Sequence, residues 1–157
     1  MRPALLPRGF TLIELLVAMA VLSVLASMLL PLGEVALQRS REQELKRALW
    51  QIRDGLDAYK RAVDSGKIST TAGASGFPPS LRALAEGVPD ARDGATRYFL
   101  RRIPRDPFAP AELAAERTWG LRSFASSADQ PRAGSDVYDV YSLSPKVALN
   151  GTPLRGW

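Results

Sequence analysis

The sequence contains no cysteine and no histidine. Without cysteine, the chain can form neither disulfides nor thiolate metal sites. Without histidine, it lacks the usual general base and the commonest metal ligand. It also has no glycine-rich phosphate loop, no nucleophile beside a base, and no pair of carboxylates on a recognisable scaffold. These absences favour a non-catalytic protein over an enzyme, and the sequence indicates no catalytic residue, no cofactor and no metal ligand.

A strong charge of one sign is also missing. The formal net charge is +5, and two of the positive charges, Arg2 and Arg8, lie in the first eight residues. This imbalance is too weak to indicate a nucleic-acid partner by itself, and we expect none. The length of 157 residues predicts one membrane segment and one modest domain.

Charged residues are absent from the 18 positions between Leu15 and Leu32. With residues 10–13 added, this run approaches the roughly 20 residues that a helix needs to cross a bilayer. A secretory signal peptide fits poorly, because its apolar core is only about 7–15 residues long and 31–33 is a poor cleavage site. A plain signal anchor fits better, with Arg2 and Arg8 holding the N-terminus in the cytoplasm. It leaves Glu14 unexplained, since an acid inside a membrane costs about 2.5–3.5 kcal/mol.

The run starts with the sequence RGFTLIE at residues 8–14. This start resembles the type IV prepilin signature, in which a short basic leader ends in glycine before an apolar helix. This resemblance implies that prepilin peptidase removes residues 1–9 by cutting between Gly9 and Phe10, and that the new amino terminus of Phe10 is methylated. Glu14 then pairs with the amino terminus of a neighbouring subunit during assembly, and methylation leaves that amine charged. The alternative is an acid at the interfacial end of an ordinary anchor. The matching residues are Arg8, Gly9, Phe10, Thr11, Leu12, Ile13 and Glu14.

Beyond the membrane segment, apolar residues continue at helical spacing. The spacings of 4, 3, 4, 3 and 4 predict an amphipathic helix, with charges on its other face. Pro31 and Gly33 mark an expected bend or local melting point, because proline removes a backbone donor and glycine adds freedom. The apolar stripe is formed by Leu45, Leu49, Ile52, Leu56, Tyr59 and Val63.

The pattern changes after Asp64. Residues 65–80 are rich in Gly, Ser, Thr and Pro and predict a loop. Ser80 and Gly87 bracket a short helix. Residues 117–126 and 136–144 alternate as half-buried strands do, on either side of a hairpin-type loop. Asp106, beside Pro107, is most simply a turn residue.

This order of elements resembles the major pseudopilins of type II secretion systems (the GspG-like group). The resemblance rests on the segments FPPSLRALAEG (77–87), YFLRRIPRDPF (98–108) and YDVYSLS (138–144), and on Trp157. It implies an α+β fold of the type IV pilin kind. A long N-terminal helix, membrane-spanning in its first half, packs on a small C-terminal antiparallel sheet domain. The expected regions are a removed leader (1–9), a transmembrane and filament-core helix (10–33), its amphipathic continuation (34–64) and a periplasmic globular domain (65–157).

The resemblance also implies a function. The chain would enter the inner membrane in a single pass, with its N-terminus cytoplasmic and its C-terminal domain periplasmic. It would then polymerise with itself and other pseudopilins into a periplasmic pseudopilus on an inner-membrane secretion platform. Two alternatives stay open. One is a type IV pilin or minor pilin for adhesion, motility or DNA uptake, and the other is an unprocessed signal-anchored periplasmic domain.

One departure from the resembled group concerns calcium. Major pseudopilins follow the last strand with a loop rich in glycine and aspartate that binds calcium, which takes six to eight oxygen ligands. The corresponding stretch here, residues 144–157, contains no Asp or Glu, and Lys146 and Arg155 would repel a dication. We therefore do not expect calcium. The loop is either held by its own packing or belongs to a specialised relative.

We predict that Gly9→Val blocks processing, because the peptidase requires a small residue before the cut. The mass of the membrane-inserted protein should then include residues 1–9, whereas the wild type should begin at Phe10. A Pro7→Ala variant, altered within the leader but away from the cut, should be trimmed normally. Normal trimming of Gly9→Val in the same immunoblot would contradict the prediction.

Overall fold

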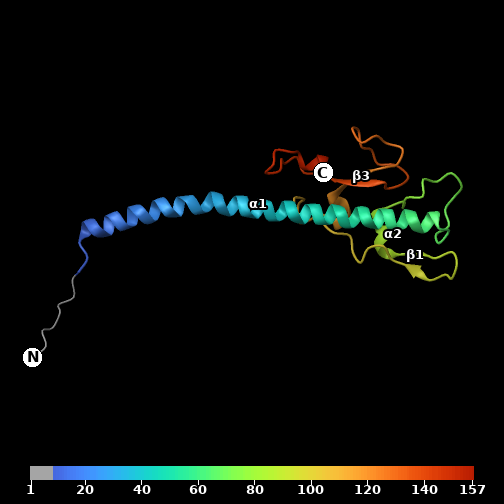
Figure 1. Cartoon of the computed structure of the whole chain (residues 1–157), viewed down its shortest axis with the longest axis horizontal. Helices are drawn as coiled ribbons and strands as arrows, with labels where there is room; N and C mark the ends of the chain where they lie inside the picture. Colours follow the sequence, from blue (N-terminus) through green and yellow to red (C-terminus); the bar gives the residue numbers. More distant parts are fainter. Residues whose placement is uncertain (1–8) are drawn as a thin grey trace, which may run out of the picture. The chain divides into compact units, whose positions relative to one another are not determined.

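A computed structural model describes residues 9–157, except for the side chains of residues 28–31. The chain divides into two compact units, residues 1–38 and 39–157. One long helix, α1 (Leu12–Asp64), begins in the first unit and continues into the second. The second unit adds a short helix, short antiparallel strands and 3₁₀ turns (Figure 1). The predicted α+β fold, a long N-terminal helix with a small antiparallel sheet domain, is confirmed.

Helix α1 is assigned without interruption through positions 31 and 33. Gly33 is exposed, and a Cβ at this position would meet no atom within 4 Å. Neither Pro31 nor Gly33 therefore interrupts the helix in this structure. A proline in a helix removes one backbone hydrogen bond while the flanking turns keep theirs. The expected bend or melting at this point stays a prediction.

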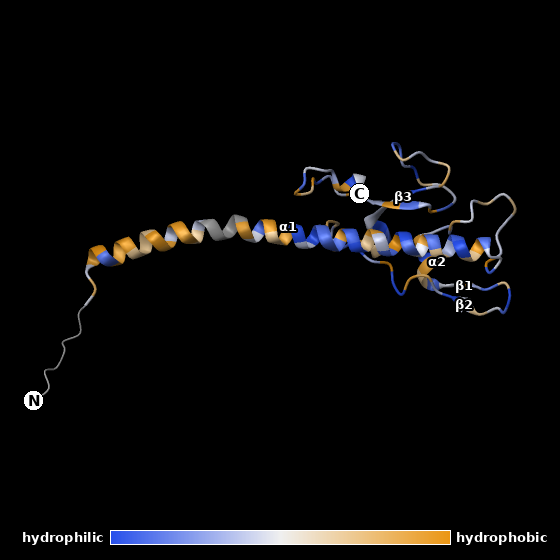
Figure 2. Cartoon of the chain, in the orientation of Figure 1, coloured by the Kyte–Doolittle hydropathy of each residue, from blue (hydrophilic) through white to orange (hydrophobic). Residues whose placement is uncertain are grey.

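In the second unit, one side of α1 packs into the hydrophobic core. The predicted apolar stripe accounts for it: Leu45, Leu49, Ile52, Leu56 and Tyr59 are buried. Figure 2 shows this part of α1 alternating between apolar and polar residues, whereas the first part is apolar almost throughout. The other buried apolar residues are Ala48, Ala62, Ile68, Leu81, Leu84, Leu100, Trp119, Val137, Val140, Ala148 and Leu154.

The predicted short helix is α2 (Leu81–Glu86). The Ser80 side chain accepts a hydrogen bond from the Ala83 backbone N–H, as expected of an N-cap. Leu84 is fully buried, and its carbonyl accepts hydrogen bonds from the backbone N–H groups of Phe99 and Leu100. Gly87 ends the helix at a φ of 85°, where a Cβ would also collide with Thr96. In the view of Figure 1, α2 and the following hairpin lie below the C-terminal part of α1.

Two antiparallel pairs make up the sheet structure. The first joins β1 (Val88–Pro89) to β2 (Thr96–Arg97), and the second joins β3 (Trp119–Arg122) to β4 (Asp139–Ser142). The second pair matches the two predicted alternating segments, with Gly120 opposite Tyr141. A Cβ at position 120 would lie 2.3 Å from the Tyr141 ring, so only glycine lets the ring cross the strand. The 3₁₀ turns are η1 (Ala115–Thr118) and η2 (Leu154–Gly156).

Asp106 is a turn residue, as the sequence predicts, but it also joins two distant segments. Its side chain is 1% exposed. One carboxylate oxygen accepts the backbone N–H of Phe108 at 2.7 Å, and the other accepts the Ser142 hydroxyl at 2.5 Å. Its own backbone N–H donates to the Thr118 hydroxyl at 3.1 Å. The turn at 104–108 is thereby fixed against strand β4 and against Thr118, the residue just before β3.

We predict that Asp106→Ala lowers the free energy of unfolding by about 1–3 kcal/mol, because it leaves the buried Ser142 hydroxyl and the Phe108 N–H without an acceptor. Asp106→Asn keeps an acceptor oxygen and should lose less. Denaturant unfolding of the full chain in detergent would measure both. If Asp106→Ala unfolded at the wild-type denaturant concentration, the carboxylate would not be fixing the turn.

Candidate functional site

The predicted processing and assembly residues lie at the start of α1. Gly9, Phe10 and Thr11 precede the helix and have no regular structure. Phe10 is 83% exposed, and a Cβ at Gly9 would meet no atom within 4 Å. The Gly9–Phe10 peptide bond is therefore outside the helical hydrogen-bond ladder. Residues 1–8, which contain the rest of the predicted leader, lie outside the described residues.

Thr11 and Glu14 form a capping box. The Glu14 backbone N–H donates to the Thr11 hydroxyl at 3.3 Å, and the Thr11 backbone N–H donates to Glu14 Oε2 at 3.4 Å. This reciprocal pattern satisfies backbone donors that a helix start leaves without intrahelical partners. The spacing Thr-x-x-Glu before an apolar run predicts such a cap, and the sequence reasoning missed it. Glu14 therefore has a local structural role in addition to any role in assembly.

The position of Glu14 also suits a negative charge electrostatically. It lies in the first turn of α1, where the partial positive charge of the helix N-terminus stabilises anions. Both hydrogen bonds of the capping box are long, and the side chain is exposed. Glu14 therefore keeps most of its capacity to accept a further charged donor.

The segment after Glu14 is apolar on every side. It contains an 18-residue window of mean hydropathy 2.5, none of which is buried by other described residues, and α1 is long and apolar enough there to cross a membrane. Its hydroxyl groups are bonded back to the helix, Ser23 to the Met19 carbonyl at 2.8 Å and Ser27 to the Val24 carbonyl at 2.7 Å. Both hydroxyl groups thus donate within the helix and need no water as acceptor. A hydrocarbon environment, which contains no water, requires such internal hydrogen bonds. A helix that is apolar all round needs lipid or other helices as its neighbours.

The second unit offers no catalytic constellation in the part of the chain that the structure describes. No group of three or more Asp or Glu residues in residues 9–157 is arranged to hold a metal ion. Every buried side-chain nitrogen or oxygen atom described has a hydrogen-bond partner. Among the described residues, the second unit thus shows neither a candidate metal site nor a buried polar side-chain atom left without a partner.

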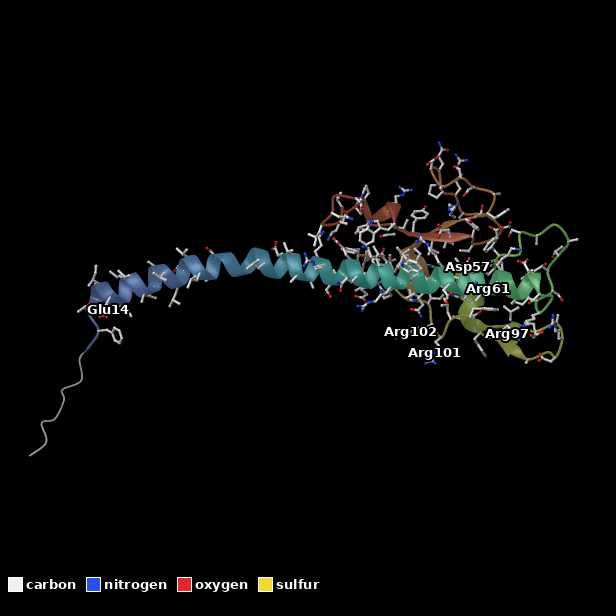
Figure 3. The ribbon with its side chains drawn as sticks, viewed as in Figure 1. Glu14, Asp57, Arg61, Arg97, Arg101 and Arg102 are labelled. Atoms are coloured by element: carbon white, nitrogen blue, oxygen red, sulfur yellow. The ribbon has the colours of Figure 1, made fainter. Side chains whose placement is uncertain are left out.

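A surface of the second unit that carries several arginines lies beside the C-terminal part of α1. Figure 3 labels Asp57 and Arg61 on the helix, and Arg97, Arg101 and Arg102 on and after β2. Arg97 bonds Asp90, and the backbone N–H of Arg92 together with the Arg97 guanidinium holds the pKa of Asp90 below its ordinary value.

The other arginines of this surface are not neutralised in the same way. Arg61, Arg101 and Arg102 are exposed and form no ion pair within the described residues. Arg61 and Arg97 line an open hollow of about 500 Å³ together with Tyr98. Because they are exposed, the guanidinium groups of Arg61, Arg101 and Arg102 are open to solvent.

Comparisons with known proteins agree with the geometry of the helix start. The prokaryotic N-terminal methylation motif matches residues 7–30. The type II secretion system core protein G of Klebsiella pneumoniae is 32% identical over 105 residues, which cover 64% of this chain and 69% of that protein. The core protein G of Aeromonas hydrophila is 26% identical over 132 residues, covering 82% of this chain and 87% of the relative. No solved structure matches the chain.

A third relative extends the similarity over nearly the whole length. The core protein G of Klebsiella michiganensis is 29% identical over 144 residues, covering 88% of this chain and 96% of the relative. The similarity therefore includes the C-terminal unit as well as the apolar helix. The predicted resemblance to prepilin-type proteins and to major pseudopilins is confirmed, and the chain belongs to the family of the type II secretion system core protein G.

Proposed function

We propose that this chain is a structural, non-catalytic subunit of a periplasmic pseudopilus that drives type II protein secretion, and that it is matured by cleavage between Gly9 and Phe10. The observation that carries the proposal is the helix start. A methylation motif covers residues 7–30, the predicted scissile bond lies just before the helix, and Glu14 lies in its first turn. Membership of the core protein G family supports the secretion role.

The proposed topology follows from the apolar helix and the leader. Arg2 and Arg8 precede the apolar run, and positive charges next to a span favour the cytoplasmic side. The C-terminal unit then lies in the periplasm, anchored by α1 in the inner membrane. Prepilin peptidase reaches the Gly9–Phe10 bond because residues 9–11 are already unwound.

Assembly gives Glu14 its partner. Cleavage creates an amine at Phe10, four residues before Glu14, and methylation keeps that amine positive. In a filament core, the Glu14 carboxylate exchanges a long hydrogen bond to Thr11 for a charged amine of a neighbouring subunit. Two charges that meet offset each other's desolvation, whereas either one alone would be penalised. The pair thus sets the register in which apolar helices pack, together with other copies and other pseudopilins.

We predict that Glu14→Gln inserts and is trimmed normally but assembles poorly. Glutamine can still close the capping box, so this variant removes the charge while keeping the local helix start. An unpaired amine in the filament core then costs about 3–5 kcal/mol for each contact, which is enough to stop elongation. Each variant should be expressed as the only copy, with the mass of the trimmed protein, the number of filaments and exoprotein release as measurements.

Two controls separate charge from capping and from general damage. Thr11→Ala removes the cap but keeps the acid, and Glu34→Gln removes an exposed acid further along α1. Both should assemble like the wild type. Normal filaments with Glu14→Gln would reject the pairing of charges. If the wild-type protein were never trimmed at Gly9, the proposed maturation would fail instead.

A further inference from the structure

The C-terminal segment, residues 143–157, is ordered although it has little regular structure. It contains only the turn η2 and a single β-bridge between Val147 and Pro153. Ala148 and Leu154 are nevertheless buried, at 5% and 0% exposure. Its own hydrogen bonds close it into a loop, from the Ala148 N–H to the Thr152 carbonyl and from the Leu154 N–H to the Lys146 carbonyl. These bonds shape the loop but do not attach it to α1.

Arg53 makes the attachment. From α1, its Nε donates to Asp139 Oδ1 at 2.8 Å, and its Nη2 donates to the Trp157 backbone oxygen at 2.8 Å and the Val140 carbonyl at 3.2 Å. Arg122 binds the second oxygen of Asp139 at 3.1 Å. One planar guanidinium thus joins the helix, strand β4 and the end of the segment, a geometry that suits arginine and not lysine.

Further contacts from α1 hold the same segment. Lys46 Nζ lies 4.5 Å from the centre of a Trp157 ring, in a cation–π arrangement. Glu42 Oε1 accepts the backbone N–H of Leu149 at 2.8 Å. The Trp157 indole N–H donates to the Thr152 hydroxyl at 2.8 Å, which fixes the ring against the loop.

The chemistry of this region does not fit calcium. The ion needs six to eight oxygens, several from carboxylates, and residues 143–157 contain no Asp or Glu. Both oxygens of Asp139, the acid at the attachment point, already bind Arg53 and Arg122. Arg155, packed over the Tyr141 ring, adds a further positive charge that would repel a dication. To bind Asp139, a calcium ion would therefore have to displace the guanidinium groups of Arg53 and Arg122.

We propose that Arg53 performs within this chain the structural task of a bound cation: it neutralises Asp139 and fastens the C-terminal segment to α1 without metal. The proposal concerns one subunit and does not depend on filament assembly. It has two consequences. Calcium has no effect on the stability of the segment, and loss of the Arg53 guanidinium opens the segment whether or not calcium is present.

The first consequence, that calcium does not affect the stability of the segment, is tested on the full chain in detergent micelles, with calcium or with a calcium chelator. Lys146 and Arg155 are trypsin sites within the segment, so the rate of cleavage there reports how often it opens. We predict the same thermal midpoint and the same cleavage rate in both conditions. A lower midpoint or faster cleavage with the chelator would reveal a calcium site and overturn the proposal.

The second consequence, that loss of the Arg53 guanidinium opens the segment, is tested by comparing Arg53→Gln with Arg61→Gln. Arg61 lies on the same helix, is exposed, and has no ion pair in the described part of the chain, and each variant removes one trypsin site from α1. Losing several hydrogen bonds to a charged group should raise cleavage in the segment by about tenfold or more in Arg53→Gln and leave it unchanged in Arg61→Gln. Equal rates in the two variants would overturn the proposal.

Circular dichroism shows whether Arg53→Gln keeps its helix. If it does not, Arg53→Lys carries the test, because lysine keeps the positive charge but cannot make the forked contacts. The expected result is faster cleavage than in Arg61→Lys. Cleavage at the same rate in both lysine variants would show that the fork does not fasten the segment.

Discussion

The first part of α1 is almost entirely apolar, and no other described residue of the chain buries it. Removing a leucine or valine side chain from water is worth about 1.5–3 kcal/mol, so a helix of this kind is driven strongly into lipid or against other helices. The hydroxyl groups of Ser23 and Ser27 oppose that transfer little, since they bond the backbone carbonyls behind them. The one acid of this part, Glu14, lies in the first turn of the helix. An apolar helix that is exposed in this way needs lipid or other helices as neighbours, which fits both a membrane location and association with other pseudopilins.

The C-terminal part of the same helix is buried on one side only. From Leu45 onward only one side is apolar, and that side is covered by the C-terminal unit. The strands of that unit come in two short pairs, and isolated two-stranded pairs are marginally stable at best in water. Helix α1 therefore supplies the surface on which α2, β3 and β4 can bury their apolar residues. One element thus serves as an anchor at its start and as the core of a domain at its end.

Local features of this fold could be predicted from the sequence, because neighbours along the chain determine them. The apolar stripe of α1, the Ser80 cap and the alternating strands are of this kind. The Thr11–Glu14 box is equally local and was missed because the acid was considered only as an assembly residue. Asp106 was correctly interpreted as a turn residue, but its bond to Ser142 spans 36 positions. The contact between Arg53 and Asp139 spans 86 positions, and neither periodicity nor spacing carries information on such pairs.

The carboxylates of Asp139 and Glu14 differ in how far their charges are paired within one copy of the chain. Within the C-terminal unit, Asp139 is held between Arg53 and Arg122, so its charge is satisfied inside one copy. Among the described residues, the Glu14 side chain accepts only a long hydrogen bond from the Thr11 backbone N–H, and such a bond is weaker than one from a charged donor. A domain whose charges are paired internally can fold before assembly. In the proposed filament, the Glu14 carboxylate, which has weak local bonds and lies at the start of an exposed apolar helix, finds its charged partner on another subunit.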